Sequence, residues 1–264
     1  MFSDKFQTER PLAVLEIGQV LGGAFAAIGR NWLSFLILTV ALYVIPLAAT
    51  TAVTQGLGRP DYSSLERGLA TWERTSLVSL PFYYFFEPLY VALIAWIVWA
   101  DASKGRSDLL GALRGVAPRL PWVLLTALLK DLIGGIGLLL FIVPGVIAIL
   151  ALYVAIPACA VEGVSAPAAI RRSLELTRGQ RWRLLGLLVV VMLMSIVLNI
   201  FIGLISMMAG FSFAGAAGLV GIALRSGGTG IVGTISTAVV ACAYLELRGA
   251  KEGVSAGEVA AVFA

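Results

Sequence analysis

The chain has 264 residues, of which 59% are hydrophobic and only 13% are charged, and its mean hydropathy is +0.96. A soluble domain carries about 25% charged and about 45–50% apolar residues, so a soluble fold is excluded and an integral membrane protein is indicated. The net charge of +4 is compatible with nucleic acid, but the arginines cluster at the ends of apolar runs, which favours anionic lipid as the partner.

Several apolar runs approach or exceed the roughly 20 residues that a helix needs to cross a bilayer. They predict an all-α fold, a polytopic bundle of six transmembrane helices joined by short interfacial amphipathic helices. Residues 1–264 are expected to form a single integral membrane domain. In chain order the predicted spans are about 32–53, 77–100, 121–143, 145–161, 184–209 and 217–245.

Residues 55–76 connect the first two spans, and their acids and arginines nearly balance. This segment is predicted to be the one sizeable loop on its side of the membrane, with room for a short surface helix. An enzymatic use of the loop is not expected.

Glu87 falls inside the second predicted span, and Lys130 and Asp131 fall inside the third. A lysine or aspartate at the centre of a span costs about 2.5–3.5 kcal/mol, so these side chains should face protein or water. Neighbouring residues on a helix point about 100° apart, so Lys130 need not pair with Asp131. We predict instead a Lys130–Glu87 pair across the bundle. Such charges either line a transport path or serve packing and assembly alone.

Residues 121–161 form either a hairpin of two spans or one long kinked span. Pro144-Gly145 favours a turn at that point, because proline fixes φ and glycine permits positive φ. With six spans, 14 of the 19 basic residues share one side, whereas five spans would separate the two most basic loops. The positive-inside rule therefore predicts six spans with both termini cytoplasmic.

The segment between spans four and five, "VEGVSAPAAIRRSLELTRGQRWRLL" (161–185), carries five arginines. Ser165 and Gly179 predict the two ends of a helix, as N-cap and C-terminal residue. Ala166, Ile170 and Leu174 recur on one face, and Arg171, Glu175 and Arg178 lie at pairing distance on another. We expect an interfacial helix whose apolar face lies in the head-group boundary and whose arginines point to phosphates.

This basic segment also contains the candidate binding site. The acid at the end of span four would orient arginines across the loop, and the arginines would contact a lipid phosphate or a partner protein. Nucleic acid is not expected, since an interfacial location already explains the charge. The candidate residues are Glu162, Arg171, Arg172, Arg178, Arg181 and Arg183.

A weak internal repeat follows spans two, four and six. Each time an acid at the span end (Asp101, Glu162 or Glu246) leads through a Gly-Ser stretch into a short amphipathic helix. The third copy contains a capping box at Ser255-Ala-Gly-Glu258. The pattern indicates a hairpin with a surface helix at the joint, used three times. The alternative is chance similarity among loops of small residues.

Metal and cofactor chemistry has little support in the sequence. Histidine is absent, which removes imidazole as ligand and base. Cys159 and Cys242 lie far apart in apolar segments and are expected to be small buried residues. We predict no metal site, no cofactor and no catalytic residues. Asn199, in span five, is expected to hydrogen-bond between helices.

The stretch from Val143 to Leu188 resembles the glycerophosphoryl diester phosphodiesterase membrane-domain family and the related YciC-like bacterial membrane proteins. The resemblance rests on Pro144-Gly145, Pro157-Ala158, Glu162-Gly163, Arg172-Ser173, 176–179 and Arg181-Trp182, with "AYLELRG" (Ala243–Gly249) as a closing pattern. It implies a six-span domain of a bacterial inner membrane. Some relatives carry a soluble phosphodiesterase domain, but this chain has no counterpart of its metal ligands, so the enzyme activity is not transferred.

Two functions follow as expectations. The first is a non-enzymatic inner-membrane protein that acts on or through phospholipids, with anionic lipids as partners. The second is a small-solute transporter or channel subunit that uses Glu87, Lys130 and Asp131. Faces of small residues are also compatible with a homo-oligomer or a membrane-protein partner.

Overall fold

A computed structural model of the chain describes residues 15–56, 63–105, 108–208 and 219–252. Every regular element in these ranges is helical, which confirms the all-α prediction. Within these ranges, six helices are long and apolar enough to cross a membrane, so the chain is a multi-pass membrane protein. They cover Trp32–Thr54, Leu65–Lys104, Leu109–Leu140, Ile142–Glu162, Arg181–Ile205 and Ile222–Glu252.

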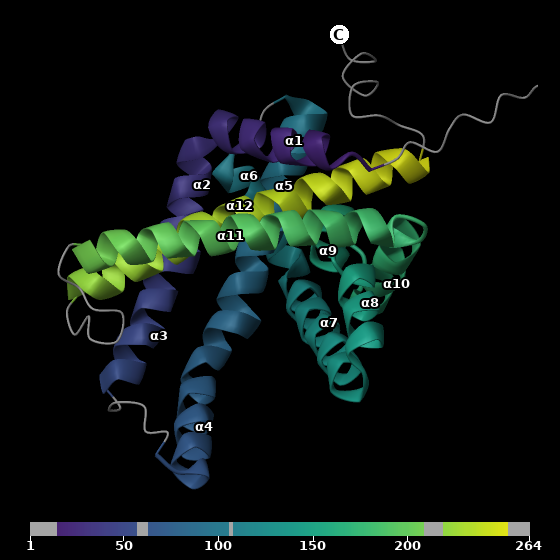
Figure 1. Cartoon of the computed structure of the whole chain (residues 1–264). Helices are drawn as coiled ribbons and strands as arrows, with labels where there is room; N and C mark the ends of the chain where they lie inside the picture. Colours follow the sequence, from purple (N-terminus) through teal and green to yellow (C-terminus); the bar gives the residue numbers. More distant parts are fainter. Residues whose placement is uncertain (1–14, 57–62, 106–107, 209–218, 253–264) are drawn as a thin grey trace, which may run out of the picture.

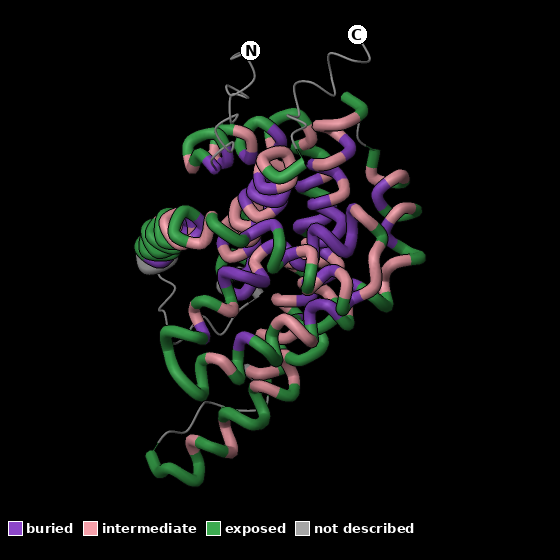
Figure 2. The backbone as a smooth tube through the Cα atoms, turned by 90° about the vertical axis from the view of Figure 1, so that its right-hand side faces the viewer, coloured by how far each residue is buried: buried purple, intermediate pink, exposed green. Residues whose placement is uncertain are grey.

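Two long helices, α11 (Arg181–Met208) and α12 (Leu219–Glu252), run side by side across the molecule (Figure 1). Helix α1 (Ile17–Arg30) packs against α12 through a face of small residues. The core lies where α5 (Glu87–Lys104) and α9 (Ala155–Glu162) meet α12. Figure 2 shows buried residues gathered in this region and exposed residues along the projecting helices.

The first span is built from α2 (Trp32–Leu38), the π-helical turn η1 (Thr39–Val44) and α3 (Ile45–Gly56). The second is built from α4 (Leu65–Pro81), the π-helical turn η2 (Phe82–Phe86) and α5. The two π-helical turns pack close to each other, with the rings of Tyr43 and Phe82 in edge-to-face contact at 5.2 Å between centroids.

The second helical run begins well before the predicted start at residue 77. The Ser64 hydroxyl accepts a hydrogen bond from the Arg67 N–H and caps α4. Most of the predicted loop therefore belongs to one continuous helix, and α4 has no buried residue. The predicted surface helix is present, but it is continuous with the second span, because polar helical turns extend from the Ser64 cap to the apolar run.

A triangle of hydroxyl groups joins three helices in the core. Thr39 Oγ1 lies 3.0 Å from the Tyr90 hydroxyl and 2.8 Å from Thr234 Oγ1, and the Tyr90 hydroxyl donates to Thr234 Oγ1 at 2.9 Å. These bonds connect η1, α5 and α12. Each polar group finds a partner inside the bundle, as a water-poor interior requires.

The third span is built from α6 (Leu109–Val116), the short 3-10 turn η3 (Ala117–Arg119) and α7 (Leu120–Leu140). The hairpin reverses at Phe141, whose extended backbone (φ −156°, ψ 139°) separates α7 from α8 (Ile142–Ala151). The hairpin prediction is confirmed.

The predicted site of the turn was wrong, because Pro144 and Gly145 lie inside α8. Proline is tolerated in the first turn of a helix, where N–H groups have no helical acceptor. Gly145 instead permits close packing, since a Cβ there would lie 2.5 Å from the backbone N of Leu138.

The fourth span is interrupted at Leu152, Tyr153 and Val154, which separate α8 from α9. Pro157 lacks an N–H and its ring would clash with the Tyr153 carbonyl in a continuous helix. The interruption leaves the Ala151 carbonyl without a helical donor. The Ser173 hydroxyl donates to it at 2.8 Å and the Thr177 hydroxyl at 3.3 Å, both from α10 (Ala166–Thr177).

Helix α10 is therefore docked into the bundle. The prediction that its inner face lies in the head-group boundary was wrong, because that face packs against the protein. The buried residues of α10 are Ala166, Ala169, Ser173, Leu176 and Thr177, whereas Leu174 is 39% exposed. Ser165 is the N-cap residue as predicted, but its side chain makes no capping bond. Gly179 follows the helix end with φ 87°, as expected.

Candidate functional site

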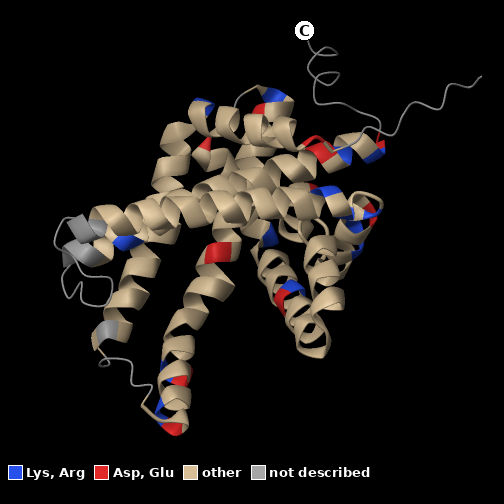
Figure 3. Ribbon diagram, viewed as in Figure 1, with Lys and Arg blue, Asp and Glu red and all other residues tan. Residues whose placement is uncertain are grey.

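Charged residues gather at the joints between the long helices and at the tip of α4, and the helices between are almost free of charge (Figure 3). The largest group lies where α9, α10 and the end of α12 meet. Glu162, the last residue of α9, forms an ion pair with Arg172 of α10. Arg172 Nε donates to Glu162 Oε1 at 3.0 Å and to Oε2 at 3.1 Å.

Helix α12 adds three side chains to this pair. The Tyr244 hydroxyl donates to Glu162 Oε1 at 2.9 Å, and Arg248 Nε donates to Glu252 Oε2 at 2.8 Å. Arg172 Nη2 also donates to Glu252 Oε1. We call these residues the polar cluster: Glu162, Arg172, Tyr244, Arg248 and Glu252.

The polar cluster balances its own charge, with two acids and two arginines. Burial of the Arg172 guanidinium acts to lower its pKa, but hydrogen bonds and charge attraction from Glu162 and Glu252 outweigh burial and raise the pKa. Arg172 therefore stays charged and fully engaged within the protein. It fixes α10 against α9 and α12 and is not free to contact a phosphate.

Arg119, from the turn before α7, caps the other side of the same joint. Its Nη1 donates to the carbonyls of Ala160 and Val161, the latter at 2.9 Å, which satisfies orphan carbonyls at the end of α9. Its guanidinium carbon lies 4.9 Å from the ring centre of Trp96. Gly163 (φ 69°) ends α9, and a Cβ there would lie 2.9 Å from the Arg119 guanidinium.

The remaining candidate arginines have different surroundings. No ion pair joins Arg171, Arg178 or Arg181 to an acid in the described ranges, and the predicted pairing of Arg171 and Arg178 with Glu175 does not form. Helix α10 ends at Thr177 and Arg178 has an extended backbone, so the helical spacing to Glu175 is lost there. Arg171 has the right spacing, but exposed long side chains gain little from pairing in water. Arg183 Nη1 donates to the Leu15 carbonyl at 3.0 Å and anchors the segment before α1.

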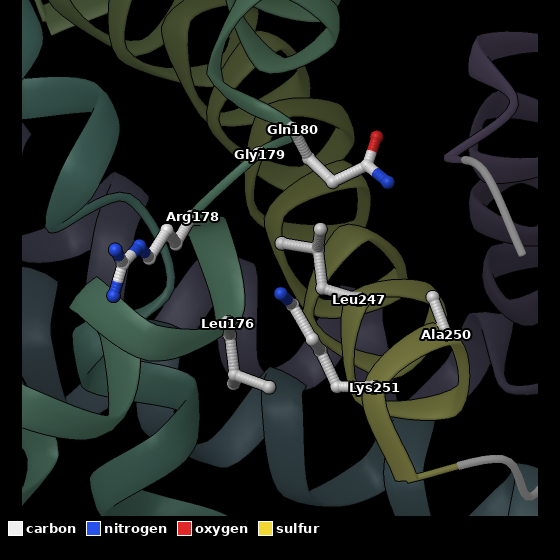
Figure 4. Close-up of a pocket in the computed structure, with 7 residues that line it drawn as sticks. All are labelled: Leu176, Arg178, Gly179, Gln180, Leu247, Ala250 and Lys251. Atoms are coloured by element: carbon white, nitrogen blue, oxygen red, sulfur yellow. The ribbon is translucent and has the colours of Figure 1, made fainter. Parts of the chain in front are cut away.

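A small groove lies between α10 and α12, beside the polar cluster. Its floor is apolar, with Leu176 and Leu247, and its lining also includes Arg178, Gly179, Gln180, Ala250 and Lys251. Lys251 reaches from α12 toward α10, while Arg178 lies at the outer edge with its guanidinium turned away (Figure 4). Trp182, the second residue of α11, is 84% exposed. An apolar floor with cations at the rim can hold an anionic amphiphile.

The intramembrane charges are arranged differently from the prediction. Lys130 Nζ lies 2.7 Å from Asp131 Oδ1, so the adjacent residues pair with each other on α7. Glu87 lies close enough to interact electrostatically with both, but forms no ion pair within the described ranges. The predicted Lys130–Glu87 pair is therefore wrong. The long lysine side chain bends to the nearest carboxylate. Because both residues are on the same helix, this pair forms with little further loss of conformational entropy.

The predicted repeat finds partial support in the first two joints. Asp101, near the end of α5, accepts two hydrogen bonds from Arg30, and Gly105 (φ 63°) follows that helix as Gly163 follows α9. In the third copy, α12 continues past Glu246 to Glu252. The capping box at 255–258 lies outside the described residues.

Both cysteines are free and buried, as predicted. Among the described residues, no group of three or more potential ligands could hold a metal ion. Sequence reasoning missed Arg119, Tyr244, Arg248, Glu252 and Lys251 as parts of the site. One signal was present, because residues 244, 248 and 252 recur at the spacing of one helical face.

A family described as a domain of unknown function, DUF7847, matches residues 64–247. The chain belongs to this family. No curated protein and no solved structure matches the chain. The resemblance to phosphodiesterase membrane domains stays a prediction.

The DUF7847 match covers α4 to most of α12. It therefore includes the joints that follow α5 and α9, and the docked helix α10. Glu162, Arg172 and Tyr244 lie inside it. Arg248, Lys251 and Glu252 lie just beyond its end. The polar cluster thus joins the DUF7847 segment to the last turns of α12.

Proposed function

We propose that this DUF7847 protein is a non-enzymatic membrane protein that acts on or through anionic phospholipids at its α10 end. One observation carries the proposal. Arg178 and Lys251 line the groove, Arg171 and Arg181 lie close to it in sequence, and none of the four has an acidic partner within the described part of the chain. An anionic surface attracts each such residue by about 1 kcal/mol.

The position of these cations at the membrane boundary supports the proposal. Trp182 lies at the start of a span and is almost fully exposed, as expected for an aromatic residue that lies among head groups. Leu174 lies on the exposed face of α10, close in sequence to Arg171 and Arg178. An exposed leucine flanked by arginines suits a helix whose outer face touches both acyl chains and phosphates.

The proposed location is a bacterial inner membrane, with both termini in the cytoplasm. The excess of basic residues on the side of α10 supports this orientation through the positive-inside rule. The resemblance of 143–188 to the membrane domains of glycerophosphoryl diester phosphodiesterases supports a link to phospholipid head groups. Organising, sensing or moving phospholipid, or scaffolding a membrane partner, are the roles that such a site would serve.

The proposal predicts that Arg178→Gln with Lys251→Gln weakens binding of phosphatidylglycerol about thirtyfold, since two cations near the groove are lost at about 1 kcal/mol each. Titration of purified protein with this lipid, followed by native mass spectrometry, measures the affinity. Binding of zwitterionic phosphatidylcholine should change less than twofold.

A matched control removes the same charge elsewhere. Arg74 and Arg225 lie on α4 and at the beginning of α12, away from the groove. Arg74→Gln with Arg225→Gln should leave phosphatidylglycerol binding unchanged. Equal losses in the two double variants, or no loss in the first, would refute a lipid site at the α10 end.

A second candidate function is transport of a small solute. The observation that favours it is the gathering of Glu87, Lys130 and Asp131, in which the lysine and aspartate side chains are 33% and 41% exposed. Intramembrane charges that are not fully enclosed are typical of solute and proton paths.

For a transport path, replacing Glu87→Gln, Lys130→Met and Asp131→Asn together should abolish flux of cations or protons in reconstituted vesicles. The measurement is pH- or ion-sensitive dye fluorescence inside the vesicles. Unchanged circular dichroism and melting temperature would show that the fold survives. Full flux in the triple variant would exclude this path.

A further inference from the structure

Helix α11 carries a polar side chain where the surroundings should be apolar. Asn199 is exposed, and its Nδ2 donates to the Ser195 carbonyl on the same helix at 2.7 Å. The second N–H and the Oδ1 of this amide have no partner among the described residues. The predicted hydrogen bond from Asn199 to another helix is thus absent from the described part of the single chain.

Asn199 lies well inside the apolar length of α11. Ile196, Val197, Ile200 and Phe201 around it are each 45% exposed or more. The helix continues for nine residues to Met208, which is about 13 Å along its axis. Hydrocarbon offers no hydrogen-bonding partner, so an amide left half-satisfied there is unfavourable.

The helix that carries Asn199 is also poorly covered by the rest of the bundle. Only 11% of the most apolar stretch of α11 is buried, against 56% for the span formed by α8 and α9. Met192 and Ile196 are exposed and precede Asn199 by seven and three residues, so all three share one face. This face combines apolar side chains with one unsatisfied amide.

We propose that this face of α11 binds the same face of a second copy, and that the two Asn199 side chains hydrogen-bond across a two-fold axis. A carboxamide is its own complement, because it carries both donors and an acceptor. A two-fold axis that passes beside Asn199 places this residue of one copy opposite the same residue of the other. One symmetric contact therefore satisfies both amides without any other protein. The proposal is independent of the lipid site, which lies at α10.

The first experiment measures dimerisation directly. Copies labelled with donor and acceptor fluorophores are mixed in phosphatidylcholine vesicles, and energy transfer is followed as the protein-to-lipid ratio is lowered. We expect a dimer for the unchanged chain, a roughly tenfold weaker dimer for Asn199→Leu, and near-normal dimerisation for Asn199→Gln. Leucine keeps the apolar surface and removes only the amide.

The second experiment locates the interface. Met192→Cys should form a disulfide between copies in oxidised membranes, because residue 192 lies within about 20° of Asn199 around the helix. Val190→Cys is the matched control, since residue 190 is similarly accessible but points about 180° away. The native cysteines are buried and should not cross-link.

Several results would overturn the proposal. A monomer at every protein-to-lipid ratio would do so, as would an unchanged dimer for Asn199→Leu or equal cross-linking at residues 190 and 192. Cross-linking of residue 192 to a different protein would show that another membrane partner covers this face. A lower melting temperature of Asn199→Leu in the monomeric state would show that the amide acts within the bundle.

Discussion

Replacing Arg172 with glutamine is expected to lower the melting temperature of the detergent-solubilised protein by about 5 °C. Arg172 joins Glu162 to Glu252, and the side chains of Arg172 and Glu162 are only 25% and 16% exposed. Removing one partner of a buried ion pair leaves an uncompensated charge, at 3–5 kcal/mol in fully buried cases. Partial exposure reduces this to about 2 kcal/mol, and each kcal/mol shifts the melting temperature by about 2–4 °C in a chain of this size.

Arg171 supplies a matched control, because it is the preceding residue on the same helix and is exposed without an ion pair among the described residues. Arg171→Gln should change the stability by less than about 0.5 kcal/mol. Circular dichroism at 222 nm during heating measures both variants. Equal melting temperatures for the two would show that the polar cluster does not hold α10 in place.

The five arginines of the basic segment 161–185 fall into two groups according to what they contact. Arg172 and Arg183 bind groups of the protein itself, whereas Arg171, Arg178 and Arg181 have no acidic partner in the described ranges. A loss of lipid binding in an Arg172 variant would therefore have a structural explanation. Variants of Arg178 and Lys251 test the lipid site without disturbing the polar cluster.

The number and approximate position of the spans followed from the sequence alone. Hydropathy over about 20 residues is a local property, and the charge of the basic segments decided between five spans and six. The start of α4 was missed because Ser64 caps a helix whose first turns are polar. Polar helical turns beyond the bilayer carry no apolar signal.

The joints could not be predicted because they depend on contacts between distant segments. Pro144-Gly145 has the sequence of a turn, but Gly145 serves the close approach of α8 to Leu138. Pro157 interrupts the fourth span, and the interruption is stable only because Ser173 and Thr177 reach the exposed carbonyl. The spacing of residues in the sequence does not predict which distant hydroxyl donates a hydrogen bond to which carbonyl.

The candidate site was predicted in part. Glu162 and Arg172 face each other across the loop, as short-range geometry suggested, since the left-handed Gly163 turns the chain back between them. Their partners on α12 lie about 80 residues later in the chain. The spacing of Tyr244, Arg248 and Glu252 marks one polar face of α12, but nothing local in the sequence indicates that α10 covers it.

The interruption of the fourth span leads to the last prediction. Replacing Ser173→Ala and Thr177→Val together should destabilise the protein by about 2 kcal/mol, because the Ala151 carbonyl loses both of its hydroxyl donors and water has little access to replace them. Both residues are fully buried in α10. The melting temperature in detergent should fall by about 5 °C.

Thr126→Val is the control for this double variant. Thr126 is equally buried, but its hydroxyl donates to the Trp122 carbonyl of the same helix, one turn earlier. That carbonyl lies within continuous α7, where it keeps its backbone donor, so the valine variant should change the stability by less than about 1 kcal/mol. If α10 instead lies on the membrane surface without docking, the double variant will melt like the control, and hydrogen exchange of α8 and α9 will be the same in both.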